Sequence, residues 1–152
     1  MIPYEDEFLD AIEMAYPAMN IHANEEAPIE AVGLVLSDGD IMRLINQTRS
    51  PSMFSVSRAQ LAERLADIDP DKHTVIAIYH SHPGGTTTLS PDDQASMRAT
   101  WTDDGMTLPW ITLVPDSRLA IWWLDPHYQA PRSAIIHYSP QITLMAEVVD
   151  AR

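Results

Sequence analysis

The chain of 152 residues contains no cysteine. This absence excludes disulfides, thiolate zinc sites and cysteine nucleophiles together, so any bound metal must be held by histidine and carboxylate side chains. Basic residues are also scarce, because nine Lys and Arg stand against 22 Asp and Glu and the formal net charge is −13. Nucleic acid is therefore not expected as a partner, since an acidic surface repels phosphate.

Long apolar runs are missing as well. The longest ones, residues 32–36 and 119–124, fall far short of the ~20 residues that a membrane helix needs. The acidic, amphipathic amino terminus does not have the pattern of a signal peptide. We therefore expect a soluble, cytoplasmic protein without membrane contact. With 45% hydrophobic residues, residues 1–152 are expected to form one domain with a buried core.

Apolar periodicity and turn signals predict both helices and strands. The expected helices cover residues 4–16, residues 57–68 and a segment that begins near residue 90. Pro17 is expected to end the first helix, and a loop is expected over residues 20–28. The expected strands cover residues 29–37, 41–46, 74–79, 110–114, 119–124 and 134–138, while the tail from residue 139 fits helix and strand equally poorly. This order indicates an α+β domain with a mixed sheet flanked by helices.

The segment Tyr-His-Ser-His-Pro-Gly-Gly carries the most chemical information. His80 and His82 lie one residue apart at the end of a predicted strand, so both rings point to the same face. The helix that begins at Ser90 can bring Asp93 back as a third ligand from its first turn. Two imidazoles and one carboxylate leave one position of a tetrahedral zinc ion for water, as in catalytic sites. Ligand type alone also admits iron, manganese or nickel.

Each of these features has a simpler explanation when taken alone. Ser90 and Asp93 have the spacing of a helix capping box, and His80 and His82 fit a half-exposed pair on a strand. Glu30, the candidate general base, also fits a surface acid at a strand edge. No partner at ligand spacing accompanies the other histidines, which are expected at the surface or in hydrogen bonds: His22, His73, His127 and His137. A metal site is favoured by the joint occurrence, at this spacing, of the two histidines, the serine, the aspartate and the upstream glutamate: His80, His82, Ser90, Asp93 and Glu30.

The spacing of these residues resembles the signature of the JAMM (MPN+) metalloprotease family. His80-Ser81-His82 is followed after seven residues by Ser90 and after two more by Asp93, which is similar to the family pattern throughout. The resemblance implies that His80, His82 and Asp93 bind zinc. It also implies that Ser90 helps to hold the tetrahedral oxyanion of the reaction.

A glutamate upstream completes the resemblance. Glu30 stands before Ala31-Val32-Gly33, similar to the family's catalytic Glu before a small residue and Gly, and it is therefore implied to be the general base. This context favours Glu30 over Glu25 and Glu26. The resemblance covers roughly residues 25–125 and implies the family's α+β fold, a cytidine-deaminase-like sandwich with a mixed sheet flanked by helices.

The resemblance also implies a function. Family members hydrolyse amide or isopeptide bonds, so a polypeptide substrate is expected, with the C-terminus of a ubiquitin-like protein or sulfur carrier as a candidate. The chain resembles prokaryotic or phage-type stand-alone members. Related domains occur in phage tail-tip assembly proteins, and an assembly or protein-binding module that keeps its zinc is the alternative function.

Two adjacent tryptophans provide a separate expectation. Trp122 and Trp123 fall in one predicted strand and must therefore face opposite sides of it. One of the two is a candidate for a surface that contacts a partner protein, because exposed aromatic side chains are enriched at such surfaces.

Overall fold

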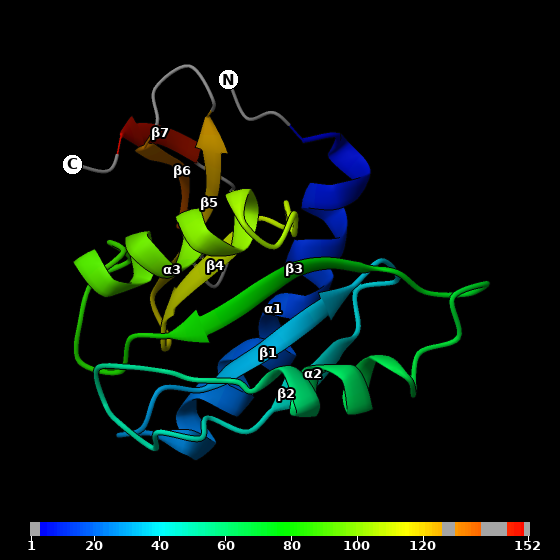
Figure 1. The fold of residues 1–152 in the computed structure, drawn as a ribbon. Coiled ribbons are helices and arrows are strands. Elements are labelled where there is room, and N and C mark those ends of the chain that lie inside the picture. The colour runs from blue at the N-terminus through cyan, green and yellow to red at the C-terminus, as the bar shows by residue number, and fades with distance from the viewer. Residues whose placement is uncertain (1–3, 126–129, 138–145, 151–152) are drawn as a thin grey trace.

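Seven strands form one sheet, with helices on both of its faces (Figure 1). The computed structural model describes residues 4–125, 130–137 and 146–150. Its elements are, in chain order, α1 (Asp6–Glu26), β1 (Val32–Leu36), β2 (Ile41–Leu44), α2 (Arg58–Leu65), β3 (Val75–Ser81), α3 (Pro91–Thr102), β4 (Trp110–Val114), β5 (Arg118–Asp125), β6 (Ala130–His137) and β7 (Ala146–Asp150). Within the described residues, no helix is both long and apolar enough to span a bilayer.

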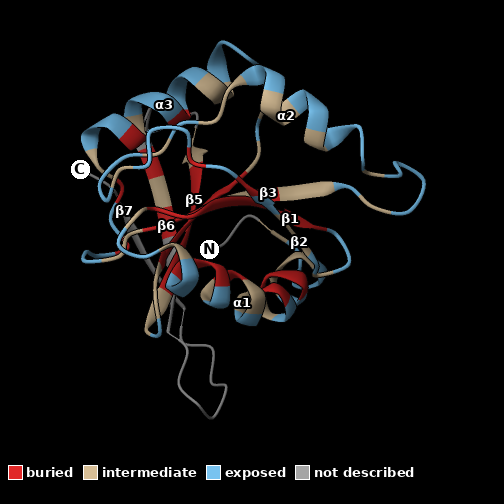
Figure 2. Ribbon diagram, turned by 90° about the horizontal axis from the view of Figure 1, so that it is seen from below, coloured by how far each residue is buried: buried red, intermediate tan, exposed pale blue. Residues whose placement is uncertain are grey.

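The sheet is mixed. Its strand order is β2-β1-β3-β4-β5-β6-β7, and β3 and β4 run parallel while every other neighbouring pair is antiparallel. Helix α1 covers one face, and α2 and α3 lie on the other face, so that the buried strands are enclosed between two helical layers (Figure 2). The predicted α+β class with a mixed sheet flanked by helices is therefore confirmed.

Helix α1 corrects the prediction that Pro17 ends the first helix. The helix continues through Pro17 to Glu26, and the expected loop over residues 20–28 begins only after it. Proline costs a helix interior about 3 kcal/mol, but Met19 and Ala23 continue the buried stripe of α1 beyond Pro17 and are fully buried against the sheet. Burying one Met side chain alone stabilises the fold by roughly 1.5–3 kcal/mol, so tertiary packing carries the helix past the proline.

The two adjacent tryptophans lie on opposite faces, as predicted. Trp122 packs with Met97 of α3, whereas the ring of Trp123 meets that of Tyr4 edge to face at 6.2 Å. Both are buried, with exposed fractions of 3% and 5%. The suggestion that one of them forms a partner surface is therefore wrong, because α3 packs over Trp122 and the segment before α1, with Tyr4, packs against Trp123.

Most other predicted elements are present, with shifted ends. Strand β3 extends to Ser81, beyond the predicted end at residue 79, and β1 begins at Val32, after the predicted start at residue 29. Helix α2 ends at Leu65, three residues short of the prediction (68 − 65). The beginning of the ambiguous tail, residues 138–145, lies outside the described residues, and the tail's later part contains β7.

Candidate metal centre

Strand pairing places a glutamate and two histidines on the same face of the sheet. Ala31 lies opposite Ser81, and two hydrogen bonds join them. The Ala31 N–H donates to Ser81 Oγ at 2.8 Å, and the Ser81 N–H donates to the Ala31 carbonyl at 2.9 Å. The neighbours of this pair, Glu30 and His82, therefore also lie opposite each other. Alternate residues of a strand point to the same face. Glu30 therefore lies beside His82, and both share the face of His80, which is the one covered by α2 and α3.

The amino terminus of α3 brings the carboxylate of Asp93 to the same place. Ser90 Oγ accepts a hydrogen bond from the Asp93 N–H at 3.0 Å, and the Ser90 N–H donates to Asp93 Oδ2 at 3.2 Å. This is the capping box that the sequence spacing allowed. The same Oδ2 atom lies 3.2 Å from Nε2 of His80 and 3.3 Å from Nε2 of His82. Capping and site formation are therefore compatible, and Asp93 takes part in both.

Three potential ligand atoms converge at one point. The Nε2 atoms of His80 and His82 are 3.0 Å apart, and Asp93 Oδ2 is close to both. His82 Nδ1 lies 2.7 Å from the Thr86 carbonyl, which can only accept, so Nδ1 carries the hydrogen and a neutral ring keeps its lone pair on Nε2. Lone pairs directed at one another from this distance are suited to a small divalent cation.

Glu30 is buried without a partner for one of its oxygens. Its side chain is 3% exposed, and Oε1 has no hydrogen bond. Glu30, His80 and His82 offer potential ligand atoms that all lie within 4.8 Å of one another. Burial raises the pKa of the Glu30 carboxyl to about 7, against the opposing effect of His82 and with a further contribution from Asp93. An acid with these properties is suited to proton transfer near neutral pH.

The backbone of Glu30 is held from the loop that follows β2. The Glu30 N–H donates to the carbonyl of Ser50 at 3.0 Å, and the side-chain amide of Asn46 donates to the Glu30 carbonyl at 3.0 Å. The Asn46 amide also donates to the carbonyl of Met53 at 2.9 Å. Asn46 therefore ties the residue before β1 to the following loop and fixes where the Glu30 side chain begins.

The raised pKa of Glu30 predicts how the stability of the metal-free protein depends on pH. Because the folded pKa of about 7 lies above the ordinary value of 4.5, the folded state loses stability as pH rises through this interval and keeps that loss above it. Glu30→Gln removes the titration. In urea unfolding without metal, we expect the free energy of unfolding of the variant to exceed that of the wild type by up to about 3 kcal/mol at pH 8. At pH 4 the two free energies of unfolding should be similar. A difference that does not change with pH would contradict the assignment.

The charges of the other site residues are set by their surroundings. Burial lowers the pKa of His80, whose ring is covered by Phe54 at a centroid distance of 4.5 Å and by Trp110 at 6.0 Å. Burial alone would raise the pKa of Asp93, but the contacts of its carboxylate with the imidazoles of His80 and His82 hold the pKa well below its usual range. The site therefore presents a carboxylate and an uncharged imidazole on an apolar floor.

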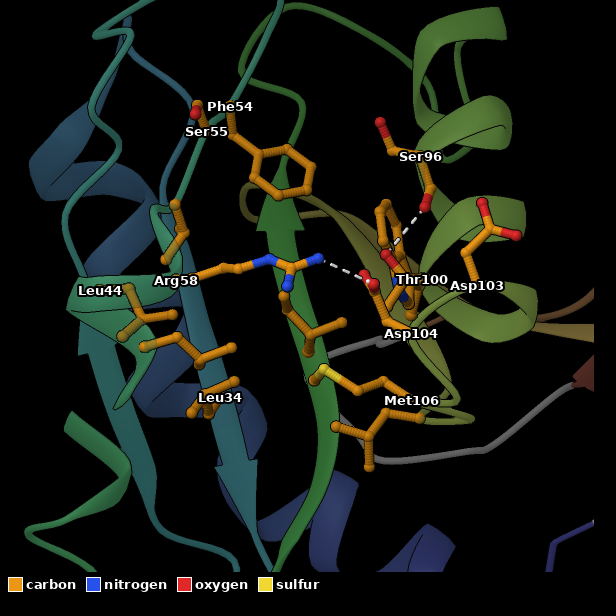
Figure 3. A pocket seen from close by; sticks show the side chains of 15 residues that line it. Leu34, Leu44, Phe54, Ser55, Arg58, Ser96, Thr100, Asp103, Asp104 and Met106 are labelled. Atoms are coloured by element: carbon orange, nitrogen blue, oxygen red, sulfur yellow. Dashed lines mark hydrogen bonds and ion pairs between the residues drawn. The ribbon is translucent and has the colours of Figure 1, made fainter. Parts of the chain in front are cut away.

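Two cavities lie on this side of the sheet, and the first of them is lined by residues of the site. One, of about 890 Å³, is lined by Glu30 and by residues of the loop between β3 and α3, among them His82 and Ser90. We call this loop, residues 82–90, the glycine loop. The other, of about 720 Å³, lies between α2 and α3, with Phe54 and Leu34 in its wall (Figure 3). Across the second cavity, the Arg58 guanidinium reaches Asp104 at 2.9 Å. Phe54 borders this cavity and the His80 ring at once.

The structure thus assembles all five residues that the sequence singled out. Sequence reasoning missed the carbonyl of Thr86 as the partner of His82, because a backbone acceptor leaves no signal in residue type. His22 was expected at the surface or in a hydrogen bond, and it is buried with its Nδ1 2.7 Å from the Tyr79 hydroxyl on the face of α1. The side chains of His127 and His137 lie outside the part of the chain that can be described.

The fold is an α+β sandwich, with one helix on one face of the sheet and two on the other. It carries a His-His-carboxylate cluster at the end of β3, so the fold and site are those of an α+β protein with a candidate metal centre. The chain matches the family model of prokaryotic homologs of the JAB domain over residues 14–125. The chain belongs to this family, which confirms the resemblance to JAMM/MPN-type proteins, and the matched range includes every residue of the candidate site. No curated protein matches the chain. JAB-family proteins are often hydrolases, although prokaryotic members include inactive ones.

Proposed function

We propose that the protein is a zinc-dependent peptidase or isopeptidase. The observation that carries this proposal is the convergence of the His80, His82 and Asp93 ligand atoms beside the unpartnered carboxyl oxygen of Glu30. A purely structural cluster does not need a buried acid without a partner, since such a group costs stability. A site that moves protons does need one.

The spacing of the ligand atoms supports zinc. Bonds of 2.0–2.1 Å to a tetrahedral zinc ion place neighbouring ligand atoms about 3.3–3.4 Å apart, and the three distances here are 3.0, 3.2 and 3.3 Å. Calcium is less suitable, because it takes six to eight oxygen ligands at longer distances. The ligands proposed for zinc are therefore His80, His82 and Asp93, with Glu30 left free.

The residues of the site divide the chemistry among them. When bound, zinc supplies a Lewis acid that polarises the scissile carbonyl and lowers the pKa of water. Glu30 takes a proton from the attacking water and later delivers it to the leaving amine. The low exposure of Glu30 keeps its carboxylate away from competing water, and Asn46 and Ser50 hold its backbone in place.

Ser90 has a hydrogen available for the oxyanion. Its hydroxyl accepts the capping hydrogen bond from the Asp93 N–H, so the hydroxyl hydrogen itself is free to be donated. We expect Ser90→Gly to lower kcat by about 10²–10³-fold, the usual cost of losing one oxyanion donor. Glycine is a tolerated N-cap that costs only a few tenths of a kcal/mol, so the helix should survive.

The matched control for this prediction is Ser90→Thr, which keeps both the cap and the hydroxyl. Its activity should stay close to that of the wild type. If Ser90→Gly hydrolysed substrate as fast as the wild type while α3 remained folded by circular dichroism, Ser90 would be a cap and nothing more.

The substrate that we propose is an extended polypeptide segment, with the C-terminus of a ubiquitin-like protein or sulfur carrier as the leading candidate. The cavity lined by Glu30, His82 and Ser90 leaves room for a peptide segment beside the site. The formal charge of −13 favours a neutral or basic partner. We propose that the protein acts in the cytoplasm.

The test is hydrolysis of amide-linked probes by zinc-loaded protein. Peptide libraries and C-terminal amide conjugates of ubiquitin-like proteins would be incubated before and after chelation, and again after zinc is restored. Cleavage that disappears with the chelator and returns with zinc supports a zinc peptidase. Protein that binds zinc but cleaves none of these probes would favour the alternative, an assembly or binding module of the kind found in phage tail tips.

A further inference from the structure

Two buried side chains on the sheet donate to a single carbonyl of the glycine loop. Thr112 of β4 and Trp122 of β5 have exposed fractions of 0% and 3%. The Thr112 hydroxyl donates to the carbonyl of Thr87. The Trp122 indole N–H lies 3.1 Å from the same carbonyl and 3.0 Å from the Thr112 hydroxyl oxygen. We call Thr87, Thr112 and Trp122 the loop anchor.

The loop anchor fixes a segment that is otherwise attached to the core through Leu89, which is 2% exposed and belongs to the same core cluster as Trp122. Between the end of β3 and the start of α3 the chain has no regular secondary structure, and Thr86 and Thr88 are exposed on either side of the buried Thr87. Thr87 is 4% exposed, although it belongs to a surface loop of small polar residues. Its backbone carbonyl is docked onto Thr112 and Trp122, so the polar loop is held to the sheet at this point by hydrogen bonds.

The neighbouring carbonyl in this loop is the one that holds His82. The Thr86 carbonyl accepts from His82 Nδ1 at 2.7 Å, and its peptide group shares the Thr87 α-carbon with the anchored carbonyl. Peptide groups are planar, so once the Thr87 carbonyl is fixed, only the φ and ψ angles of Thr87 set the direction of the Thr86 carbonyl. A hydrogen bond to the second ring nitrogen of a metal ligand fixes its tautomer and orientation.

We infer that Thr112 and Trp122 are positioning residues for His82, acting through Thr87 and Thr86 to aim His82 Nε2 at Asp93 and the proposed metal. The inference rests on the proposed function, since it assigns part of the zinc affinity to side chains that contact no ligand atom. The competing explanation is that the anchor merely satisfies two buried donors, as nearly all proteins do. The two explanations differ in what happens to metal binding.

The test measures zinc affinity by competition with a chromophoric chelator, together with urea unfolding of the same proteins. Thr112→Val keeps the shape of the side chain but removes the hydroxyl, and Trp122→Phe removes the indole N–H. We expect each variant to bind zinc about tenfold more weakly, at the lower end of the usual effect of changes around metal ligands. Thr112→Ser, which keeps the hydroxyl, should restore the affinity.

The matched control is Trp101→Phe. The Trp101 indole N–H also donates to a loop carbonyl, that of Leu108 at 2.8 Å, and Trp101 packs against the same core cluster as Trp122. Trp101→Phe should lower stability without weakening zinc binding. Equal zinc affinities in Thr112→Val, Trp122→Phe and the wild type would overturn the inference, and so would an equal loss in Trp101→Phe.

A second readout does not require metal. In the metal-free wild type, at a pH at which the imidazoles are neutral, nitrogen-15 spectra should show His82 with its hydrogen on Nδ1. Trp122→Phe and Thr112→Val should show a mixture of the two tautomers, and an unchanged spectrum in both would overturn the inference. A wild type that binds no zinc at all is a different outcome, because it removes the proposed function itself.

Discussion

Glu30→Gln is expected to lower hydrolysis by about 10²–10⁴-fold, the usual contribution of a general base, while zinc remains bound. Glutamine has nearly the same shape but cannot accept a proton. Glu30 is 3% exposed, and its Oε1 has no hydrogen-bond partner, so the substitution breaks no contact of that oxygen. The measurement is kcat/KM on a substrate found by the library assay, with zinc content determined on the same samples.

The control for this prediction is Glu26→Gln. Glu26 lies at the end of α1, only four residues away (30 − 26), and outside the cluster of potential ligands. It should retain full activity. Turnover by Glu30→Gln at the wild-type rate would remove Glu30 from the mechanism, whereas loss of zinc together with activity would show that Glu30 is a ligand and not the base.

His82→Ala and Asp93→Asn are expected to lose bound zinc and, with it, activity. The purified wild type should contain about one zinc ion per chain, as expected for a site of three protein ligands. Each substitution removes one of the three converging atoms. Asparagine keeps the size of Asp93 and an oxygen that can accept from the Ser90 N–H, so the amino terminus of α3 should remain folded. Elemental analysis of the three proteins provides the measurement.

The control histidine is His73, which lies in the loop before β3, 3.2 Å from Asp38. His73→Ala should keep the zinc content of the wild type. Absence of metal from the wild type, even after zinc is supplied, would contradict the proposal of a zinc enzyme. The chain would then be a JAB-family domain with another function. Full zinc content in both site variants would mean that the metal is bound elsewhere.

Together, the two experiments separate binding of metal from catalysis. Loss of activity with zinc retained in Glu30→Gln, and loss of zinc in Asp93→Asn, would assign the two carboxylates to different tasks. The electrostatics already differ in that direction, because burial raises the pKa of Glu30 to about 7, whereas the neighbouring imidazoles hold the pKa of Asp93 low. The carboxyl groups of Glu30 and Asp93 therefore differ in pKa because their surroundings differ.

Local sequence signals were sufficient for much of the site. Ser90 and Asp93 have capping-box spacing, and the helix starts there because the cap depends on neighbouring residues alone. His80 and His82 share a face because strand side chains alternate. Both features depend on interactions within a few residues. The ends of the strand Trp110–Val114 were also predicted correctly, from its apolar run and the turn that follows it.

Features that depend on contacts between distant residues could be decided only by the fold. The continuation of α1 past Pro17 required the buried positions of Met19 and Ala23 against the sheet, which outweigh the local effect of proline. The burial of both Trp122 and Trp123 required α3 on one face and the segment before α1 on the other. Residue type and spacing carry no record of such contacts, because a local pattern does not specify what packs against it.

The same division applies to the chemistry. The residue types and spacing of His80, His82 and Asp93 are enough to predict a metal site from the sequence. The unpartnered oxygen of Glu30 and the carbonyl that orients His82 depend on strand pairing and on loop docking. They arise only when segments far apart in the chain are brought together, since burial and backbone direction are properties of the folded molecule.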